Sequence, residues 1–258
     1  IIVGPGTGLK GGYDPKQGGA SPWEAPRRPQ YLASKRDEPE DDETRSDASQ
    51  LEEEPTLHAY TDSSSAATGM TAGIKTYNNA VLVDPAGRQV VSIAHRAQLG
   101  GMAVGAVSSV PISHATPAAA YAHNVNRNDF QDLTRDLLGQ PSISHPVRPL
   151  EGLDVLIAGG YGVVRWEDEA QGTNFIPGNA YLSELDLCAI DANQGGRYVV
   201  AMRTRGCDGQ SQLMGAAELA VQKRKRLFGF FGVNLLPLLL RSDPMRVGVA
   251  GALHHVVE

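Results

Sequence analysis

Cysteine is scarce in this sequence, since Cys188 and Cys207 are the only two among 258 residues. A disulfide-stapled small domain is therefore excluded, because such domains carry several closely spaced cysteine pairs. Long apolar runs are missing as well. The longest, residues 227–240, is interrupted by Asn234 and Pro237, whereas a membrane-spanning helix needs about 18 or more apolar residues in succession. No basic and then apolar leader opens the sequence, so we expect neither a signal peptide in it nor a membrane partner.

Two common site signatures are also absent. The seven histidines form no H-E-x-x-H pattern and the two cysteines form no C-x-x-C pair, so there is no compact zinc motif. Residues 6–11 fit G-x-G-x-x-G, but the glycine-rich residues that follow cannot open the helix that a dinucleotide site requires. His254 and His255 are adjacent, and neighbouring side chains point in different directions, so we do not expect this pair to bind a metal.

Charge of one sign is concentrated in one place. The formal net charge is −6, and residues 35–54 alone hold ten acidic and three basic residues. The rest of the chain has 19 acidic and 20 basic residues and is nearly neutral. A protein that binds nucleic acid shows a clustered basic face, so we predict no nucleic-acid partner. The short basic run of residues 223–226 is interpreted as a solvated helix end.

The composition divides the chain into three parts. Residues 1–8 are predicted to form a first strand and a glycine turn. Residues 9–57 are rich in glycine, proline, serine and acidic residues, and they bury too little apolar surface to offset their ordering entropy, so we predict a disordered acidic segment. Residues 58–258 are predicted to form a partial α/β domain. The chain as a whole is 41% hydrophobic, which suits a buried core.

Helical and strand patterns alternate in this third part. This alternation predicts a mostly parallel sheet flanked by helices. Cys188 falls within a predicted helix and is expected to be a buried, small apolar residue. The predicted helices are residues 63–75, 117–126, 183–191 and 211–222, and the predicted strands are residues 104–110, 153–158, 197–202 and 227–233.

The most informative segment is residues 61–80, which read TDSSSAATGMTAGIKTYNNA. Asp62 and Ser63 come directly before a predicted helix of small residues. The amide groups and the positive dipole end at a helix N-terminus bind anions and stabilise an alkoxide. Aspartate and serine are also ordinary helix caps, so the residues alone leave both an anion site and simple capping open.

A second segment, residues 113–127, reads SHATPAAAYAHNVNR. Together the two segments resemble the alkaline phosphatase family, which carries T-D-S-x-x-(S/A)-A-T leading to (T/S)-G-(V/I)-K-T-Y-N, and later (D/H)-A-T-P-A-A followed by an arginine. The resemblance extends over roughly residues 58–233. It implies that Ser63 is the nucleophile that forms a phosphoserine and that Arg127 grips two phosphate oxygens, with Asp62 beside it in the substrate-binding site. It also implies that Thr116 helps to bind magnesium and that His114 lies beside that ion.

The resemblance implies an alkaline phosphatase-like α/β fold and hydrolysis of phosphate monoesters with two Zn²⁺ ions and one Mg²⁺ ion. Family members are often homodimers and are periplasmic or secreted. Two departures bear on activity. Pro5 stands where the family has a metal-bridging aspartate, and the downstream D-x-x-x-H and D-H zinc ligands are not found.

We therefore expect an incomplete chain that corresponds to the N-terminal half of such a phosphatase and is inactive alone. Two alternatives stay open. The first is a catalytically dead relative that keeps an anion site. The second is an interaction module whose acidic tail recruits a partner by charge.

Overall fold

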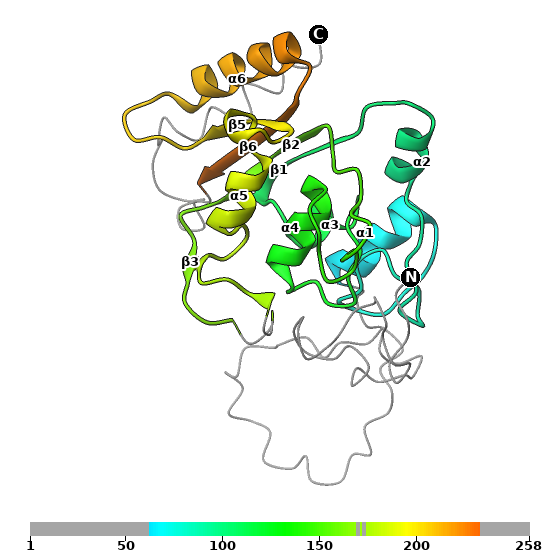
Figure 1. Ribbon diagram of the computed structural model, residues 1–258. Coiled ribbons are helices and arrows are strands. Elements are labelled where there is room, and N and C mark those ends of the chain that lie inside the picture. Colours follow the sequence, from blue (N-terminus) through cyan, green and yellow to red (C-terminus); the bar gives the residue numbers. More distant parts are fainter. Residues whose placement is uncertain (1–61, 169–170, 172–173, 233–258) are drawn as a thin grey trace, which may run out of the picture.

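The computed structural model describes residues 62–168, 171 and 174–232 (Figure 1). Three sequence predictions lie outside these residues: the strand and glycine turn of residues 1–8 with Pro5, the acidic segment 9–57, and the pair His254 and His255. All secondary structure described below belongs to the predicted third part of the chain.

A four-stranded sheet forms the centre of the described part. Its order is β1-β2-β6-β5, and every neighbouring pair is parallel. The sequence prediction of a mostly parallel sheet is therefore confirmed. The strands are β1 (Gly105–Pro111), β2 (Val155–Tyr161), β5 (Tyr198–Met202) and β6 (Arg226–Gly232). A short antiparallel pair, β3 (Val164–Arg165) with β4 (Gly178–Asn179), was not predicted.

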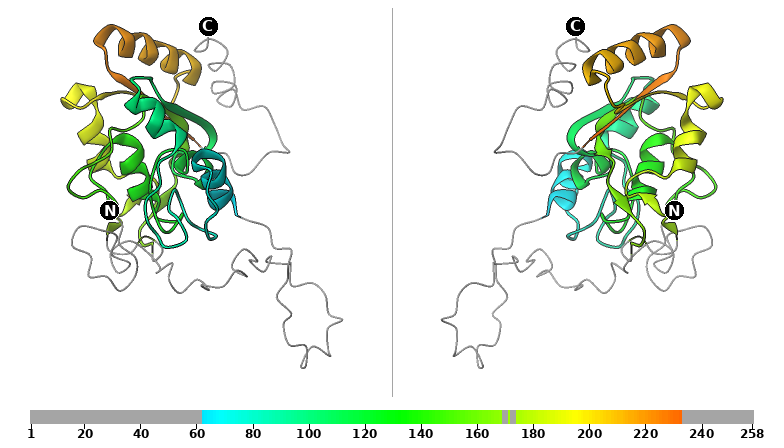
Figure 2. Two further views of the ribbon diagram at one scale, coloured as in Figure 1. Left: turned by 90° about the vertical axis from the view of Figure 1, so that its right-hand side faces the viewer. Right: turned by 90° about the vertical axis from the view of Figure 1, so that its left-hand side faces the viewer.

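Helices cover both faces of this sheet. Figure 1 and both views of Figure 2 show α6, in orange, and α1, in cyan, on opposite sides of it. The helices are α1 (Ser63–Ala72), α2 (Ile93–Leu99), α3 (Ala115–Ala118), α4 (Phe130–Leu138), α5 (Glu184–Ile190) and α6 (Gly209–Lys223), with a 3₁₀ helix at Ala192–Gln194. The architecture is thus the helix-flanked α/β fold that the alternating pattern predicts.

The alternation of side chains along the strands explains the two layers. Successive strand residues point to opposite faces. Leu156 and Phe228 lie in the larger apolar cluster, which includes residues of α1, α3 and α4. Ile157 and Leu227, one position away, pack in the smaller cluster with Leu213 of α6. Both faces of the strands are apolar, as is typical of a buried parallel sheet.

Two predictions about local structure need correction. The helix predicted for residues 117–126 ends after Ala118, because the following chain pairs with another segment: the backbone groups of Asn124 and Val81 exchange hydrogen bonds of 2.9 Å. The expectation that Cys188 is buried is wrong, since its side chain is exposed. Helix α5 buries only Ile190 among its residues, so most of it lies at the surface.

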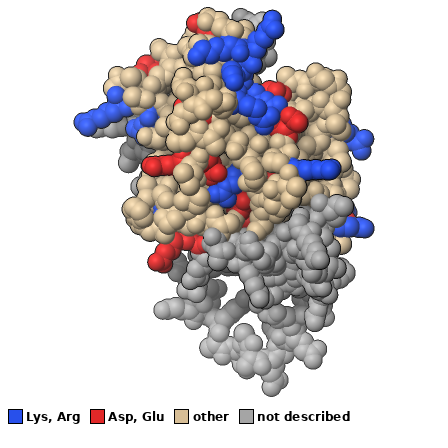
Figure 3. Space-filling model, viewed as in Figure 1, with Lys and Arg blue, Asp and Glu red and all other residues tan. Residues whose placement is uncertain are grey.

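The surface carries both signs of charge. On the face seen in Figure 3, lysines and arginines lie in separate groups, with aspartates and glutamates between several of them. Within residues 62–232 as described, no helix combines the length and the apolar character needed to cross a bilayer.

Candidate active site

Ser63 is the first residue of α1, and its side chain is exposed. Asp62 is the N-cap of this helix, and its Oδ1 accepts the backbone N–H of Ser65 at 3.0 Å. The capping that the sequence leaves open is therefore present. Ser63 takes no part in this capping, because the capping oxygen belongs to Asp62. The Ser63 hydroxyl instead accepts a hydrogen bond from Arg127.

Arg127 brings the second sequence motif to the first. Its Nη1 donates to Ser63 Oγ at 2.8 Å and to Asp62 Oδ2 at 3.0 Å. The side chains of Arg127 and Asp62 are only 19% and 17% exposed, so solvent screens this ion pair incompletely. The backbone N–H of Arg127 donates to the carbonyl of Asn79 at 2.9 Å, which fixes the chain where the side chain begins. Three of the predicted site residues, Asp62, Ser63 and Arg127, thus lie together.

The carboxylate of Asp62 gathers several donors. Burial opposes its ionisation, but hydrogen bonds from the Ser64 and Ser65 hydroxyls, the Ser65 backbone and Arg127 outweigh burial and hold the pKa of Asp62 below its ordinary value. The two hydroxyls donate at 2.6 Å and 2.5 Å. A negative charge is therefore fixed beside the Arg127 guanidinium at neutral pH.

Small residues let α1 pack closely and hold Ser63 in place. Thr71 Oγ1 donates to the carbonyl of Ala119 at 2.7 Å, which ties α1 to the end of α3. Thr68 Oγ1 accepts the backbone N–H of Leu82 at 3.0 Å. The helix ends at Gly73, whose φ of 73° is left-handed and suits a glycine cap. The N-terminus that presents Ser63 therefore belongs to a helix anchored along its length.

His114 and Thr116 lie at the start of α3. His114 is the N-cap residue, and its ring stacks on Phe130 with centroids 6.4 Å apart. Burial lowers the pKa of His114, and the charge of Arg127 lowers it further, so the imidazole is neutral at neutral pH. The side chain of Thr116 is exposed. The effect of Arg127 on His114 connects this end of α3 electrostatically to the Ser63 region.

These two residues do not complete a metal site. Mg²⁺ takes six ligands, mostly oxygens, whereas Thr116 and His114 offer one hydroxyl and one ring nitrogen. Among the described residues, one group of three or more His, Cys, Asp or Glu side chains is close enough to hold an ion, and it contains neither residue. Within this part of the chain, the residues present therefore do not fit the family's magnesium or zinc sites.

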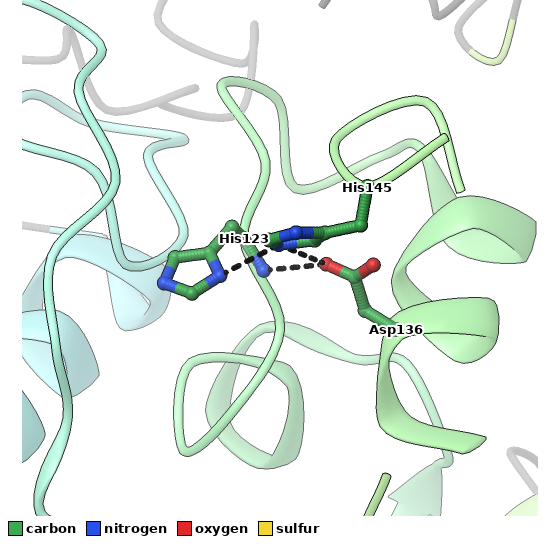
Figure 4. A group of neighbouring side chains, drawn as sticks. All are labelled: His123, Asp136 and His145. Carbon is green, nitrogen blue, oxygen red and sulfur yellow. Dashed lines mark hydrogen bonds and ion pairs between the residues drawn. The ribbon is translucent and has the colours of Figure 1, made fainter. Parts of the chain in front are cut away.

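That group is His123, Asp136 and His145 (Figure 4), which sequence analysis did not bring together. The two histidines are 22 residues apart, so no short motif marks them. Burial lowers the pKa of His123 to about 3, and the charge of His95 adds to the effect. Burial likewise lowers the pKa of His145 to about 4 and raises that of Asp136 to about 8. Both imidazoles are therefore neutral at neutral pH.

Comparison with known proteins agrees with the motifs. A family model described as alkaline phosphatase matches residues 30–244. Alkaline phosphatase 4 of Bacillus subtilis is 38% identical over 100 residues, which are 39% of this chain and 21% of that protein. The alkaline phosphatase of Escherichia coli K12 is 42% identical over 70 residues, 27% of this chain and 15% of that protein. The chain thus matches only about a fifth or less of the length of these relatives.

Solved structures of alkaline phosphatases are also among the proteins to which this chain is similar. A variant of TAB5 alkaline phosphatase with Mg bound in its M3 site is 24% identical, with a TM-score of 0.41, and the match covers 67% of this chain and 50% of that one. Thermus thermophilus alkaline phosphatase is 21% identical, with a TM-score of 0.47, over 76% of this chain and 35% of that one. Since the family model matches well over half of the sequence, the chain belongs to the alkaline phosphatase family.

Proposed function

We propose that this chain supplies the nucleophile and the phosphate-binding arginine of a phosphomonoester hydrolase that works through a phosphoserine. The observation that carries the proposal is the 2.8 Å contact between Arg127 Nη1 and Ser63 Oγ at the exposed N-terminus of α1. Family membership supports a phosphatase, and this contact supports Ser63 and Arg127 as the groups that meet the phosphate.

The chemistry accounts for each of the three side chains. A phosphate monoester is a dianion that repels nucleophiles, so positive charge must face its oxygens. An arginine fork meets two oxygens at once. Asp62 acts as a positioning residue, because its ion pair holds Arg127 beside Ser63. The N-terminal amides of the ten-residue helix α1 add positive potential.

The proposed reaction has two displacements. Ser63 Oγ forms a bond to phosphorus while the bond to the leaving alkoxide breaks. The serine proton passes to solvent, and the leaving alkoxide takes a proton from solvent to become the alcohol. Water then attacks the phosphoserine, which releases inorganic phosphate and returns the serine hydroxyl. Thr116 and His114 are proposed as metal-side residues of the same site. No step is derived through a metal, because the described residues do not complete a metal site.

Phosphate and vanadate binding, measured by calorimetry on the full chain, tests the anion site. Arg127→Ala should weaken binding at least about tenfold, because each charge-assisted hydrogen bond contributes about 1.5–3 kcal/mol. Arg88→Ala is the matched control, since Arg88 pairs with Asp84 at 2.7 Å on the surface. An equal loss of anion affinity in Arg127→Ala and Arg88→Ala, or no anion binding by the parent chain, would refute the anion site.

Phosphoserine formation is tested separately. The chain is supplied with Zn²⁺, Mg²⁺ and p-nitrophenyl phosphate and quenched in acid, and the peptide that carries Ser63 is analysed by fragmentation mass spectrometry. Phosphate on Ser63 that disappears in Ser63→Ala supports the nucleophile. Phosphate on Ser64 instead would contradict it.

We propose that this chain alone shows no sustained turnover, since its described residues place no zinc cluster that includes Ser63 or His114. Steady release of p-nitrophenol that is lost in Ser63→Ala would overturn this. The lack of such a cluster among the described residues favours one alternative function, that of a catalytically dead relative that binds anions. It predicts phosphate binding that depends on Arg127 with neither phosphoserine nor turnover.

Two further proposals rest on the family alone. One is a homodimer, which light scattering on the purified protein would detect. The other is a periplasmic or secreted location, which cell fractionation would test. An interaction role for the acidic residues 35–54 lies outside the described residues.

A further inference from the structure

Three elements deliver His123, Asp136 and His145 to one point (Figure 4). His123 lies between α3 and α4, Asp136 lies in the last turns of α4, and His145 follows α4. None of the three is Ser63, Arg127, His114 or Thr116, so the cluster uses no residue of the candidate active site.

The distances between the possible ligand atoms are those of a small coordination shell. His123 Nδ1 is 3.1 Å from His145 Nε2, and His145 Nε2 is 3.7 Å from Asp136 Oδ2. One ligand atom from each residue lies within 4.8 Å of the others. Zinc bonds of about 2.0–2.2 Å in a tetrahedron put neighbouring ligand atoms about 3.3–3.6 Å apart. A single ion therefore fits between them with small side-chain shifts.

The surrounding hydrogen bonds orient the ligands. His123 Nε2 lies 2.9 Å from the carbonyl of Val90. A carbonyl only accepts, so Nε2 carries the ring proton of neutral His123 and Nδ1 presents its lone pair to the cluster. Metal-binding histidines typically donate their other ring N–H to such a carbonyl.

The carboxylate is held in a comparable way. Asp136 Oδ1 accepts the hydroxyl of Ser142, and Oδ2 accepts the backbone N–H of His123 at 2.9 Å. The Asp136 side chain is fully buried, while that of His145 is 11% exposed. The cluster is therefore preorganised on its inner side, and its outer edge at His145 is the part that reaches solvent.

We propose that His123, Asp136 and His145 form a structural binding site for one divalent transition-metal ion, with Zn²⁺ as the best match. Two imidazoles and one carboxylate suit zinc better than Mg²⁺ or Ca²⁺, which take mainly oxygen ligands. The ion would join the chain after α4 to α4 itself and to the segment that leads to Arg127. The same three groups have one other simple occupant, a hydrogen-bond proton that neutral His145 donates from Nε2 to His123 Nδ1.

Zinc titration of the full chain distinguishes these occupants. After removal of metals with a chelator, Zn²⁺ alone is added and followed by calorimetry and by thermal unfolding. We expect a binding event that raises the melting temperature. His145→Gln should weaken it about 100-fold, because one of three protein ligands is lost. His145 lies at the accessible edge of the cluster, so circular dichroism should show that this variant folds.

Two controls separate this site from others. His95→Gln alters a ring stacked 5.0 Å from His123 that is outside the cluster, and His114→Gln alters the family's metal-side position. Both should keep the binding event. Cobalt added to the parent chain should give tetrahedral visible absorption bands that are lost in Asp136→Asn. Absence of the event in the parent chain, its persistence in His145→Gln, or its loss in His114→Gln would overturn the proposal.

Discussion

Asp62 is the residue at which the architecture of the proposed site can be tested most sharply. Asp62→Asn keeps a good N-cap, because asparagine caps helices as well as aspartate does. It removes the charge that faces Arg127 in a pair whose side chains are 17% and 19% exposed. Fully buried pairs cost about 3–5 kcal/mol when one partner is removed, and exposed pairs contribute about 0–1 kcal/mol. We therefore expect Asp62→Asn to lower the free energy of unfolding by about 2 kcal/mol.

Asp62→Ala should cost more, because it also removes the cap and the acceptor of two hydroxyls. The cap contributes about 1 kcal/mol, and each hydrogen bond from Ser64 or Ser65 about 0.5–1.5 kcal/mol. The total loss in the free energy of unfolding is about 4–6 kcal/mol. Urea unfolding of the full chain at neutral pH, followed by circular dichroism, measures both losses.

The pH dependence gives an independent check. The pKa of Asp62 is lower in the folded protein than its ordinary value, so its contribution is present above that ordinary value and is lost as the pH falls through the folded pKa. The difference in the free energy of unfolding between the parent chain and Asp62→Asn should therefore disappear in acid. Asp208→Asn is the matched control, because Asp208 caps α6 through Ser211 with no ion pair to a described residue. The reasoning is refuted if both asparagine variants lose the same stability.

Three other substitutions test the fold. Gly139→Ala should destabilise the protein more than Gly73→Ala does. Both glycines end helices with a left-handed φ, 68° at Gly139 and 73° at Gly73. However, a Cβ added at Gly139 would lie 2.7 Å from the carbonyl oxygen of Glu151, whereas one added at Gly73 would face open space. We expect about 1–2 kcal/mol for Gly73 from backbone strain alone and a distinctly larger loss for Gly139 in thermal unfolding. Burial and then the charge of Asp132 raise the pKa of Asp129 well above its ordinary value. The contribution of Asp129 to the free energy of unfolding is therefore greatest in acid and declines as the pH rises. In urea unfolding, Asp129→Asn should make the free energy of unfolding fall less steeply with pH.

Sequence reasoning succeeds here where a signal is local. Asp62 caps α1 through a backbone group three residues away. The apolar composition of β2 and β6 by itself predicts that these strands are buried. Helix α4 was missed although Phe130, Leu133 and Leu137 recur at helical spacing, since buried polar residues of the same helix obscured the pattern.

Nonlocal contacts account for the remaining differences. The end of α3 is set by pairing with Val81, and the exposure of Cys188 by which side of α5 meets the core. Pairing of Ser63 with Arg127 was predicted only through the family motifs, because 64 residues separate them. His123 and His145 carry no such motif, so only the folded chain brings them together.

The segment from residue 119 to residue 127 is anchored at several points: Ala119 to Thr71, His123 to Val90, Asn124 to Val81 and Arg127 to Asn79. A segment fixed in this way has little conformational entropy left to lose when an anion binds. An arriving anion therefore meets a guanidinium whose backbone is already in place, and the free energy of their attraction is not spent on ordering the chain. We expect phosphate binding to carry a small entropic penalty, which substitutions that loosen the segment would increase without touching the anion.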